Sequence, residues 1–141
     1  MAFTGNFTCD VFKTWLMNGD FDFSTDTFYI ALYTNAAELD ATTTAYTSTG
    51  EVVASGYTAG GELLVINQVP TTGNPPNTTA YLSFANASWT GAFTARGALI
   101  YKAGDNGAVC VLDFGADKTS ANTFVVQFPA ATDTTAIIRI A

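Results

Sequence analysis

The sequence predicts a mainly β fold, an antiparallel β-sandwich or barrel-like domain of about eight strands with one short N-terminal helix. Residues 94–115 hold two apolar runs on either side of a clear hairpin turn. Other short apolar runs recur between segments rich in Gly, Pro, Asn and Thr. Only residues 8–19 show helical spacing, and the length of 141 residues suits one domain covering residues 1–141.

Residues 8–19 carry the signals of a short helix. Thr8 is placed to cap the N-terminus, Asp10 favours the first turn, and Gly19 stands where a left-handed residue ends a helix. One apolar stripe at helical spacing is formed by Val11, Phe12, Trp15 and Leu16. We expect this stripe to pack onto the strand at residues 27–33, because so short a helix needs tertiary contacts to persist.

The apolar run at residues 27–33 shows no alternation, which predicts a strand covered on both faces. Residues 34–50 are rich in Ala and Thr, so we interpret them as a long surface excursion that clasps a neighbouring molecule. Residues 70–77 contain three prolines and are expected to be neither strand nor helix. Further strands are expected at residues 51–55, 62–68, 81–84, 121–128 and 136–140.

The hairpin at residues 94–115 turns at Asp105, Asn106 and Gly107, which tolerate the positive φ angles of a tight turn. A two-residue loop predicts one core face made of Leu99, Tyr101, Cys110, Leu112 and Phe114. The opposite face then mixes charged and aliphatic residues, namely Arg96, Ile100, Lys102, Val109, Val111 and Asp113. Such a face suits packing on another element or another subunit.

The chain is acidic and poor in charge. Twelve acidic and five basic residues give a net charge of −7, and charged residues make up 12% of the chain, about half the usual share. The basic residues are scattered at Lys13, Arg96, Lys102, Lys118 and Arg139. Nucleic acid and anionic membranes need clustered cations, so we expect neither as a partner. The low charge favours an assembled state, the alternative being a monomer with a threonine-coated exterior.

The N-terminal residues lack the basic and apolar regions of a signal peptide, and no stretch approaches the roughly 18 apolar residues of a membrane span. We therefore expect the protein in a cytosol, at least initially. In that compartment Cys9 and Cys110 are interpreted as two buried thiols, with a disulfide as the minor alternative.

The sequence contains no histidine, which removes the usual base of a Ser or Cys nucleophile and the commonest zinc ligand. We expect no enzyme activity, no catalytic residues and no cofactor. The one metal-like pattern places oxygen side chains at alternate positions, as calcium loops do: Asp20, Asp22, Ser24 and Asp26. Thr25 stands where such a loop needs Gly, and no closing Glu follows, so we interpret the segment as an acidic turn and expect no metal.

Two other patterns have candidate roles. Glycosylation sequons begin at Asn6, Asn77 and Asn86, and without a secretory signal they carry no functional meaning. Tyr57, Trp89 and Phe93 are candidates for a sugar-stacking platform, but such aromatics more often lie in a core or an interface, which is the interpretation we favour.

Several short motifs follow one another along nearly the whole chain. They are LMNG at residues 16–19, DTFYIALYT at 26–34, SGYTAGG at 55–61, SW at 88–89, TARGALIY at 94–101 and DFGAD at 113–117. Their order and spacing resemble a family of small virion structural proteins of tailed bacteriophages. The resemblance implies a structural role, as a capsid decoration or cement protein or as a small head or tail component. It carries over no catalytic residues.

The resemblance and the composition together favour a capsid decoration protein that stabilises the shell through loop-mediated subunit contacts. The expected partners are the major capsid protein or other virion proteins, and further copies of the same chain. The expected location is the virion, assembled in the host cytoplasm. The alternative is a small tail, fibre or head–tail component that acts as a binding module, with a glycan as one candidate ligand. Copy number per particle separates the two hypotheses.

Overall fold

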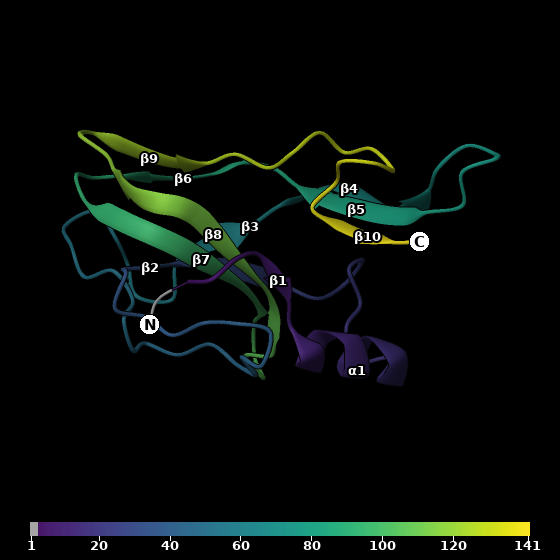
Figure 1. The fold of residues 1–141 in the computed structure, drawn as a ribbon, viewed down its shortest axis with the longest axis horizontal. Helices are drawn as coiled ribbons and strands as arrows, with labels where there is room; N and C mark the ends of the chain where they lie inside the picture. Colours follow the sequence, from purple (N-terminus) through teal and green to yellow (C-terminus); the bar gives the residue numbers. More distant parts are fainter. Residues whose placement is uncertain (1–2) are drawn as a thin grey trace.

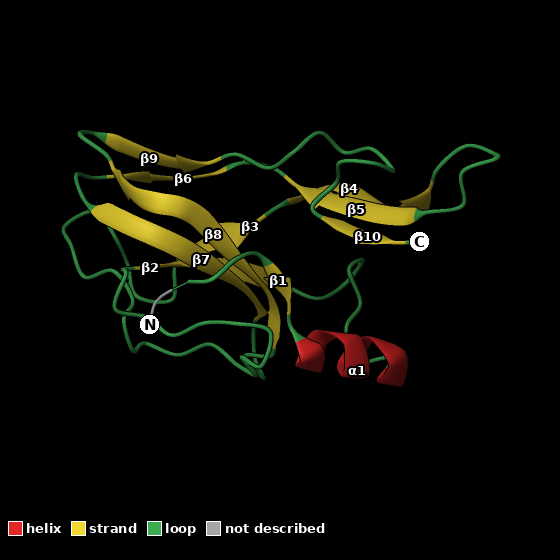
Figure 2. Ribbon diagram, viewed as in Figure 1, coloured by secondary structure: helices red, strands yellow, loops and turns green. Residues whose placement is uncertain are grey.

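The computed structural model describes residues 3–141, which form ten β-strands and one α-helix (Figures 1 and 2). The predicted fold class, mainly β and antiparallel with one short N-terminal helix, is confirmed. In chain order the elements are β1 (Phe7–Thr8), α1 (Asp10–Asn18), β2 (Phe28–Tyr33), β3 (Glu62–Leu64), β4 (Ile66–Thr72), β5 (Ala80–Phe84), β6 (Ala87–Thr90), β7 (Thr94–Lys102), β8 (Ala108–Thr119), β9 (Thr123–Val126) and β10 (Ile138–Ile140).

The strands form three antiparallel sheets, and none of them closes into a barrel. The main sheet has the order β1-β8-β7-β2-β3, and the two smaller sheets have the orders β10-β5-β4 and β6-β9. Figure 1 shows β6 and β9 lying over the main sheet, with β10, β5 and β4 farther along the same side. One cluster of buried apolar residues joins all three sheets.

The β7–β8 hairpin is confirmed, but its turn is longer than predicted. The Lys102 N–H donates to the Gly107 carbonyl over 2.9 Å, so residues 103–106 form the loop in place of two residues. Positive φ angles occur at Gly104 (97°) and at Asn106 (63°), a residue type that tolerates this left-handed conformation.

A β-bulge in β8 makes the predicted assignment of hairpin faces wrong. Successive cross-strand pairs are Tyr101–Ala108, Ile100–Cys110 and Leu99–Val111. Val109 therefore has no partner across the ladder, and every β8 residue beyond it is displaced by one position. Because side chains alternate between faces, Leu99 shares its face with Val111 and not with Cys110 or Leu112. Both faces of the hairpin are nevertheless apolar and buried around this point.

Strand β2 is covered on both faces, as predicted. Ile30, Ala31, Leu32 and Tyr33 are all fully buried although they point alternately to opposite sides. On one face, the ring of Phe28 lies 4.6 Å from that of Phe23 and 6.2 Å from that of Phe84 in β5. The opposite face is covered by the chain that follows β2.

Residues 34–61, which we call the covering segment, run over one face of the main sheet. The irregular chain expected at residues 34–50 is present, with many exposed positions, but it packs on the sheet more closely than expected, and its contact with a neighbouring molecule stays a prediction. Ala37, Leu39 and Val52 are buried, and β-bridges join Ala45 to Gly107 and Tyr33 to Glu51. The segment thus leaves the end of β2, reaches the start of β8 and returns to β2. The strand expected at residues 51–55 is reduced to the bridge at Glu51.

Small residues allow this covering segment to lie close to itself and to the sheet. A Cβ atom on Gly50 would stand 2.7 Å from the Cα of Ala37, and one on Gly61 would stand 1.8 Å from the carbonyl oxygen of Ile30. Composition alone predicted a loop because Ala and Thr add little apolar bulk. Close backbone approach, together with a few widely spaced large side chains such as Leu39 and Val52, buries the segment.

Helix α1 differs from the prediction at its start and agrees at its end. Its N-cap is Cys9 and not Thr8, and no side chain caps it. The Asp10 N–H is satisfied by the Ala41 carbonyl (2.8 Å) of the covering segment. Gly19 ends the helix in the left-handed conformation with φ 84°, as predicted. Within residues 3–141 no helix is long and apolar enough to cross a membrane.

The helix does not pack directly onto β2 as expected but reaches it through intervening rings. The Phe12 ring lies 5.0 Å from that of Phe21 and 5.9 Å from that of Phe23, which stacks on Phe28. Trp15 covers the hairpin loop, where a Cβ on Gly107 would come within 2.3 Å of the indole. The chain between helix and strand therefore supplies the contact surface.

The remaining strands differ from the prediction in two places: one expected strand is divided into two, and one segment expected to contain no strand contributes to β4. The strand expected at residues 62–68 divides at Val65, where the chain passes from the main sheet (β3) to a smaller sheet (β4). Pro70 lies inside β4, although residues 70–77 were expected to contain no strand. Proline is tolerated there because β4 is an edge strand with two register irregularities. The expected strands at residues 81–84, 121–128 and 136–140 correspond to β5, β9 and β10, whereas β1 and β6 were not predicted.

Replacement of Phe12 tests the ring cluster beneath the helix. Phe12→Ala removes a ring that is 3% exposed and contacts two other rings, so we expect a loss of about 3–5 kcal/mol in the free energy of unfolding, measured by urea denaturation. Met17→Ala on the same helix is the matched control, because its side chain is 88% exposed, and a change within about 0.5 kcal/mol is expected. Equal losses in the two variants would contradict this packing.

Candidate functional site

A buried carboxylate lies within the covering segment. Glu51 is only 6% exposed, and three donors satisfy it. Its Oε1 accepts hydrogen bonds from the Tyr57 hydroxyl and the Gly60 N–H, and its Oε2 accepts one from the Tyr46 hydroxyl, each over 2.7 Å. Hydrogen bonds to a charged acceptor are strong, and they offset the cost of removing the carboxylate from water.

Tyrosine hydroxyls extend this network to the main sheet. The Tyr57 hydroxyl also accepts from the Leu32 N–H of β2 over 2.9 Å. The Tyr101 hydroxyl of β7 donates to the Gly60 carbonyl over 2.7 Å. From the end of β2, the Tyr33 hydroxyl donates to the Thr47 carbonyl over 2.6 Å. The covering segment is therefore attached to two strands through side chains rather than through a regular ladder.

Burial keeps these hydroxyls protonated. It raises the pKa of Tyr57 and of Tyr46 far above the ordinary value, and the hydrogen bond that each donates to Glu51 raises it further. Burial also raises the pKa of Tyr33, and it raises that of Tyr101 to about 12. The arrangement acts as a set of neutral donors around one carboxylate, which suits fixing a segment in place.

The acidic turn between α1 and β2 uses its own oxygens. Asp22 Oδ1 accepts from the Ser24 N–H (2.8 Å) and from the Ser24 hydroxyl, which lowers the pKa of Asp22. Asp26 Oδ2 accepts from the Asp22 N–H over 2.7 Å. The Lys102 ammonium donates to the Asp20 carbonyl (2.6 Å) and lies 3.5 Å from Asp26 Oδ2. No three acidic, Cys or His side chains within residues 3–141 are grouped to hold a metal ion.

Both cysteines are free and buried, in agreement with the sequence interpretation. Cys9 is fully buried, and burial raises its pKa to about 12. Burial likewise raises the pKa of Cys110. Neither thiol therefore has the thiolate character that nucleophilic chemistry requires at neutral pH.

The three aromatics considered for a sugar platform lie in the core. The Tyr57 ring lies 6.2 Å from that of Trp89 and 5.8 Å from that of Phe93. Trp89 is 2% exposed and Phe93 is 7% exposed, so a sugar has no ring face to stack on. The core interpretation is confirmed. The Trp89 Nε1 has no hydrogen-bond partner within residues 3–141, which indicates that the residue serves packing.

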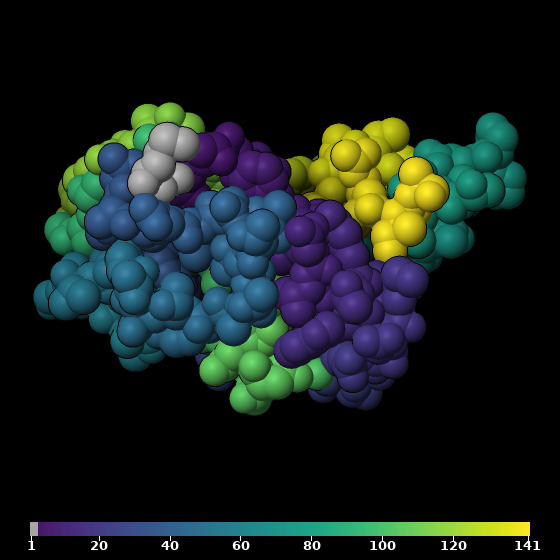
Figure 3. Space-filling model, turned by 60° about the horizontal axis from the view of Figure 1, so that its bottom comes forward, coloured from purple at the N-terminus to yellow at the C-terminus, as the bar shows by residue number. Residues whose placement is uncertain are grey.

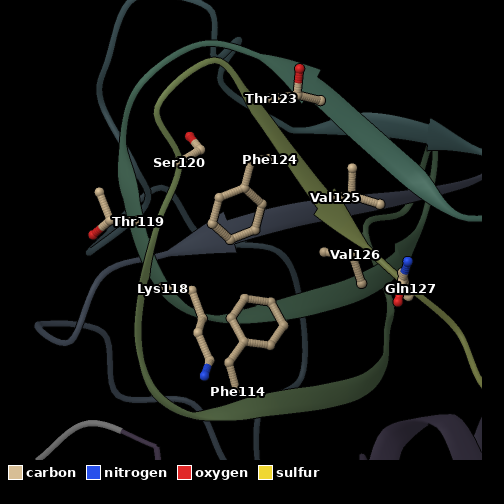
Figure 4. A pocket seen from close by; sticks show the side chains of 9 residues that line it. All are labelled: Phe114, Lys118, Thr119, Ser120, Thr123, Phe124, Val125, Val126 and Gln127. Atoms are coloured by element: carbon tan, nitrogen blue, oxygen red, sulfur yellow. The ribbon is translucent and has the colours of Figure 1, made fainter.

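A groove of about 410 Å³ opens between the end of β8 and β9 (Figure 4). Figure 4 shows the rings of Phe114 and Phe124 on its floor, and their centroids are 6.1 Å apart. The Ser120 hydroxyl already has a partner within the fold, because it donates to the Gly91 carbonyl over 2.7 Å. Thr119 is likewise hydrogen-bonded through its hydroxyl to that of Thr94. The groove therefore has an apolar floor and a polar rim that includes Lys118, Thr123 and Gln127.

A more apolar groove lies between α1 and β10, and sequence analysis did not predict it. It consists of two adjoining hollows of about 370 and 120 Å³ that share Phe12, Leu16, Ile138 and Ile140. Met17 (88% exposed) and Ile140 (54% exposed) lie on this surface, and Lys13 and Arg139 line the larger hollow. Figure 3 shows the purple helix and the yellow C-terminal strand side by side on one face. We call this feature the helix groove.

Comparisons with protein-family models, curated protein sequences and solved structures return no match for this chain.

Replacement of Glu51 tests whether the carboxylate holds the covering segment. Glu51→Ala leaves three buried donors without an acceptor, and we expect a loss of more than about 2 kcal/mol in the free energy of unfolding. Glu51→Gln keeps one carbonyl acceptor and should lose less. Asp117→Asn, at an exposed position on β8, is the control and should change stability by less than about 0.5 kcal/mol. A neutral Glu51→Ala variant would show that the network does not stabilise the fold.

Alkaline titration tests the same network through its hydroxyls. Tyrosines in the unfolded chain ionise near pH 10, whereas the folded pKa values of Tyr33, Tyr46, Tyr57 and Tyr101 are raised. Their contribution to stability is therefore complete below pH 10 and is lost as the pH rises above it. We expect phenolate absorbance and loss of circular dichroism to rise together. Full phenolate absorbance from a chain with native circular dichroism would contradict the assignment.

Proposed function

We propose that this protein is a structural subunit of a tailed bacteriophage virion, most specifically a capsid decoration protein. The observation that carries the proposal is an exposed apolar surface on a chain with few charges to oppose association. Within residues 3–141, seven large hydrophobic side chains are between 46% and 96% exposed: Met17, Val53, Leu63, Val65, Val69, Val125 and Ile140. The sequence motifs that resemble small phage virion proteins supply the biological setting.

Open sheet edges support an assembly role. Strands β3, β4 and β10 each stand at the edge of a sheet and pair on one side only. Leu63, Val65 and Val69 lie in or beside β3 and β4, where exposed lysines commonly discourage pairing with other chains. This stretch contains no lysine. Backbone pairing and apolar contact are thus both available to a neighbouring subunit.

The shape of the molecule also suits attachment to a shell. The β4–β5 hairpin projects from the body in Figure 1, and its tip lies far from the main sheet. A decoration protein adds buried area between shell subunits, and a specific contact of this kind buries at least about 1,000 Å² in total. The proposed partners are the major capsid protein and other copies of this chain, and the proposed location is the virion.

A small tail, fibre or head–tail component remains the alternative. The version of this alternative in which the protein binds a glycan has no aromatic platform to support it, because Tyr57, Trp89 and Phe93 are packed in the core. What separates the two proposals is copy number, since a shell carries hundreds of decoration subunits and a tail carries far fewer of any one component.

Immunogold labelling and quantitative mass spectrometry of purified phage particles test the proposed function. We expect label over the head and a copy number comparable to that of the major capsid protein. Label confined to the tail at low copy number would replace decoration with the tail component. Absence of the protein from particles, while it accumulates in the host cytosol, would overturn the virion role altogether.

A further inference from the structure

The helix groove borders a strand edge that is open for pairing. Strand β10 pairs with β5 on one side, through Ile138–Leu82, Arg139–Tyr81 and Ile140–Ala80, and nothing within residues 3–141 pairs with its other side. Apolar side chains of α1 and β10 line the groove beside it. A strand added to this edge would satisfy its backbone and place alternate side chains in the groove.

Within residues 3–141, one cation at the helix groove, Arg139, forms no ion pair. Three of the five basic residues form ion pairs, since Lys13 contacts Asp10, Arg96 contacts Asp113, and Lys102 contacts Asp26 and Asp105. Within residues 3–141, Arg139 makes no ion pair within 4 Å, and the Lys13 pair is exposed and weak. In a chain of net charge −7, an apolar groove edged by Arg139 and Lys13 selects a segment that carries a carboxylate beside apolar residues.

The chain itself contains a matching segment at the β3 edge of the main sheet. Strand β3 is an edge strand of three residues, as is β10. Glu62 and Leu63 of β3 and the following Val65 are exposed, the two aliphatic side chains by 53% and 59%. Within residues 3–141 the Glu62 carboxylate forms no ion pair.

We propose that the helix groove of one copy binds residues 62–65 of a second copy. Strand β3 pairs along the open edge of β10, Glu62 faces Arg139 and Lys13, and Leu63 and Val65 cover Met17 and Ile140. This inference deepens the proposed function by assigning the surface through which subunits contact each other, and it rests on that function for its biological setting.

The two surfaces are different, so the contact is head-to-tail and leaves a free groove on one end and a free β3 on the other. Such a contact closes into a ring when the rotation between copies allows it, and otherwise extends. A closed ring matches subunits that surround a symmetry axis of a shell.

Charge-swapped variants test this pairing in solution, independently of phage particles. Arg139→Glu alone sets a carboxylate against Glu62, and Glu62→Lys alone sets a lysine against Arg139. Each variant should weaken self-association roughly tenfold, measured by sedimentation velocity over a concentration series. A mixture of the two variants should recover association, because every groove then finds an opposite charge when the copies alternate. The double variant should also associate.

Asp117→Lys is the matched control, because it makes the same change of charge at an exposed position on β8, outside the helix groove, and should leave association unchanged. Circular dichroism melts confirm that each variant is folded. A wild-type chain that stays monomeric up to millimolar concentration, or a mixture no better than either single variant, would overturn the pairing. Because immunogold labelling reports the virion role separately, a monomeric chain that still decorates particles would overturn this inference and leave the proposed function standing.

Discussion

The burial of one face of the main sheet depends on the carboxylate of Glu51. That face carries tyrosines, whose hydroxyls need partners when buried. Tyr33 and Tyr101 of the sheet donate to backbone carbonyls of the covering segment. Glu51 acts within that segment, where it accepts from Tyr46 and from Tyr57, whose hydroxyl in turn accepts from the Leu32 N–H of the sheet. Without the carboxylate, the hydroxyls of Tyr46 and Tyr57 would lose their acceptor. The covering segment would then be held less firmly, and one apolar face of the main sheet would become accessible to water.

The sequence predicted those elements that have a clear periodicity of apolar residues or a recognisable turn motif. The helix end at Gly19, the β7–β8 hairpin and the two-sided burial of β2 belong to this group. The bulge at Val109 was not predictable, because both faces of β8 are apolar there and a shift by one residue leaves no mark on the pattern. The packing of the covering segment was not predicted, because a composition rich in Ala and Thr is typical of an exposed loop. Its burial depends partly on close backbone approach at small residues, which leaves no apolar pattern in the sequence.

The same division applies to the candidate sites. Burial of the two thiols and the core position of Trp89 follow from general tendencies of residue types, and sequence reasoning anticipated them. The Glu51 network and the helix groove are assembled from distant parts of the chain. Leu16 and Ile140, which line one groove, stand near opposite ends of the sequence, and no local signal connects them.

The strand order also dictates when the fold can form during synthesis. Strand β2 lies inside the main sheet between β3 and β7, yet β7 spans Thr94–Lys102, and β1 pairs with β8 across most of the chain. Such high contact order slows folding, because long loops must close before the pairing is rewarded. The apolar β2 therefore leaves the ribosome long before its partner exists. Phe23, whose ring stacks on Phe28 of β2 in the folded protein, is translated before that strand and is therefore available to cover it in that interval.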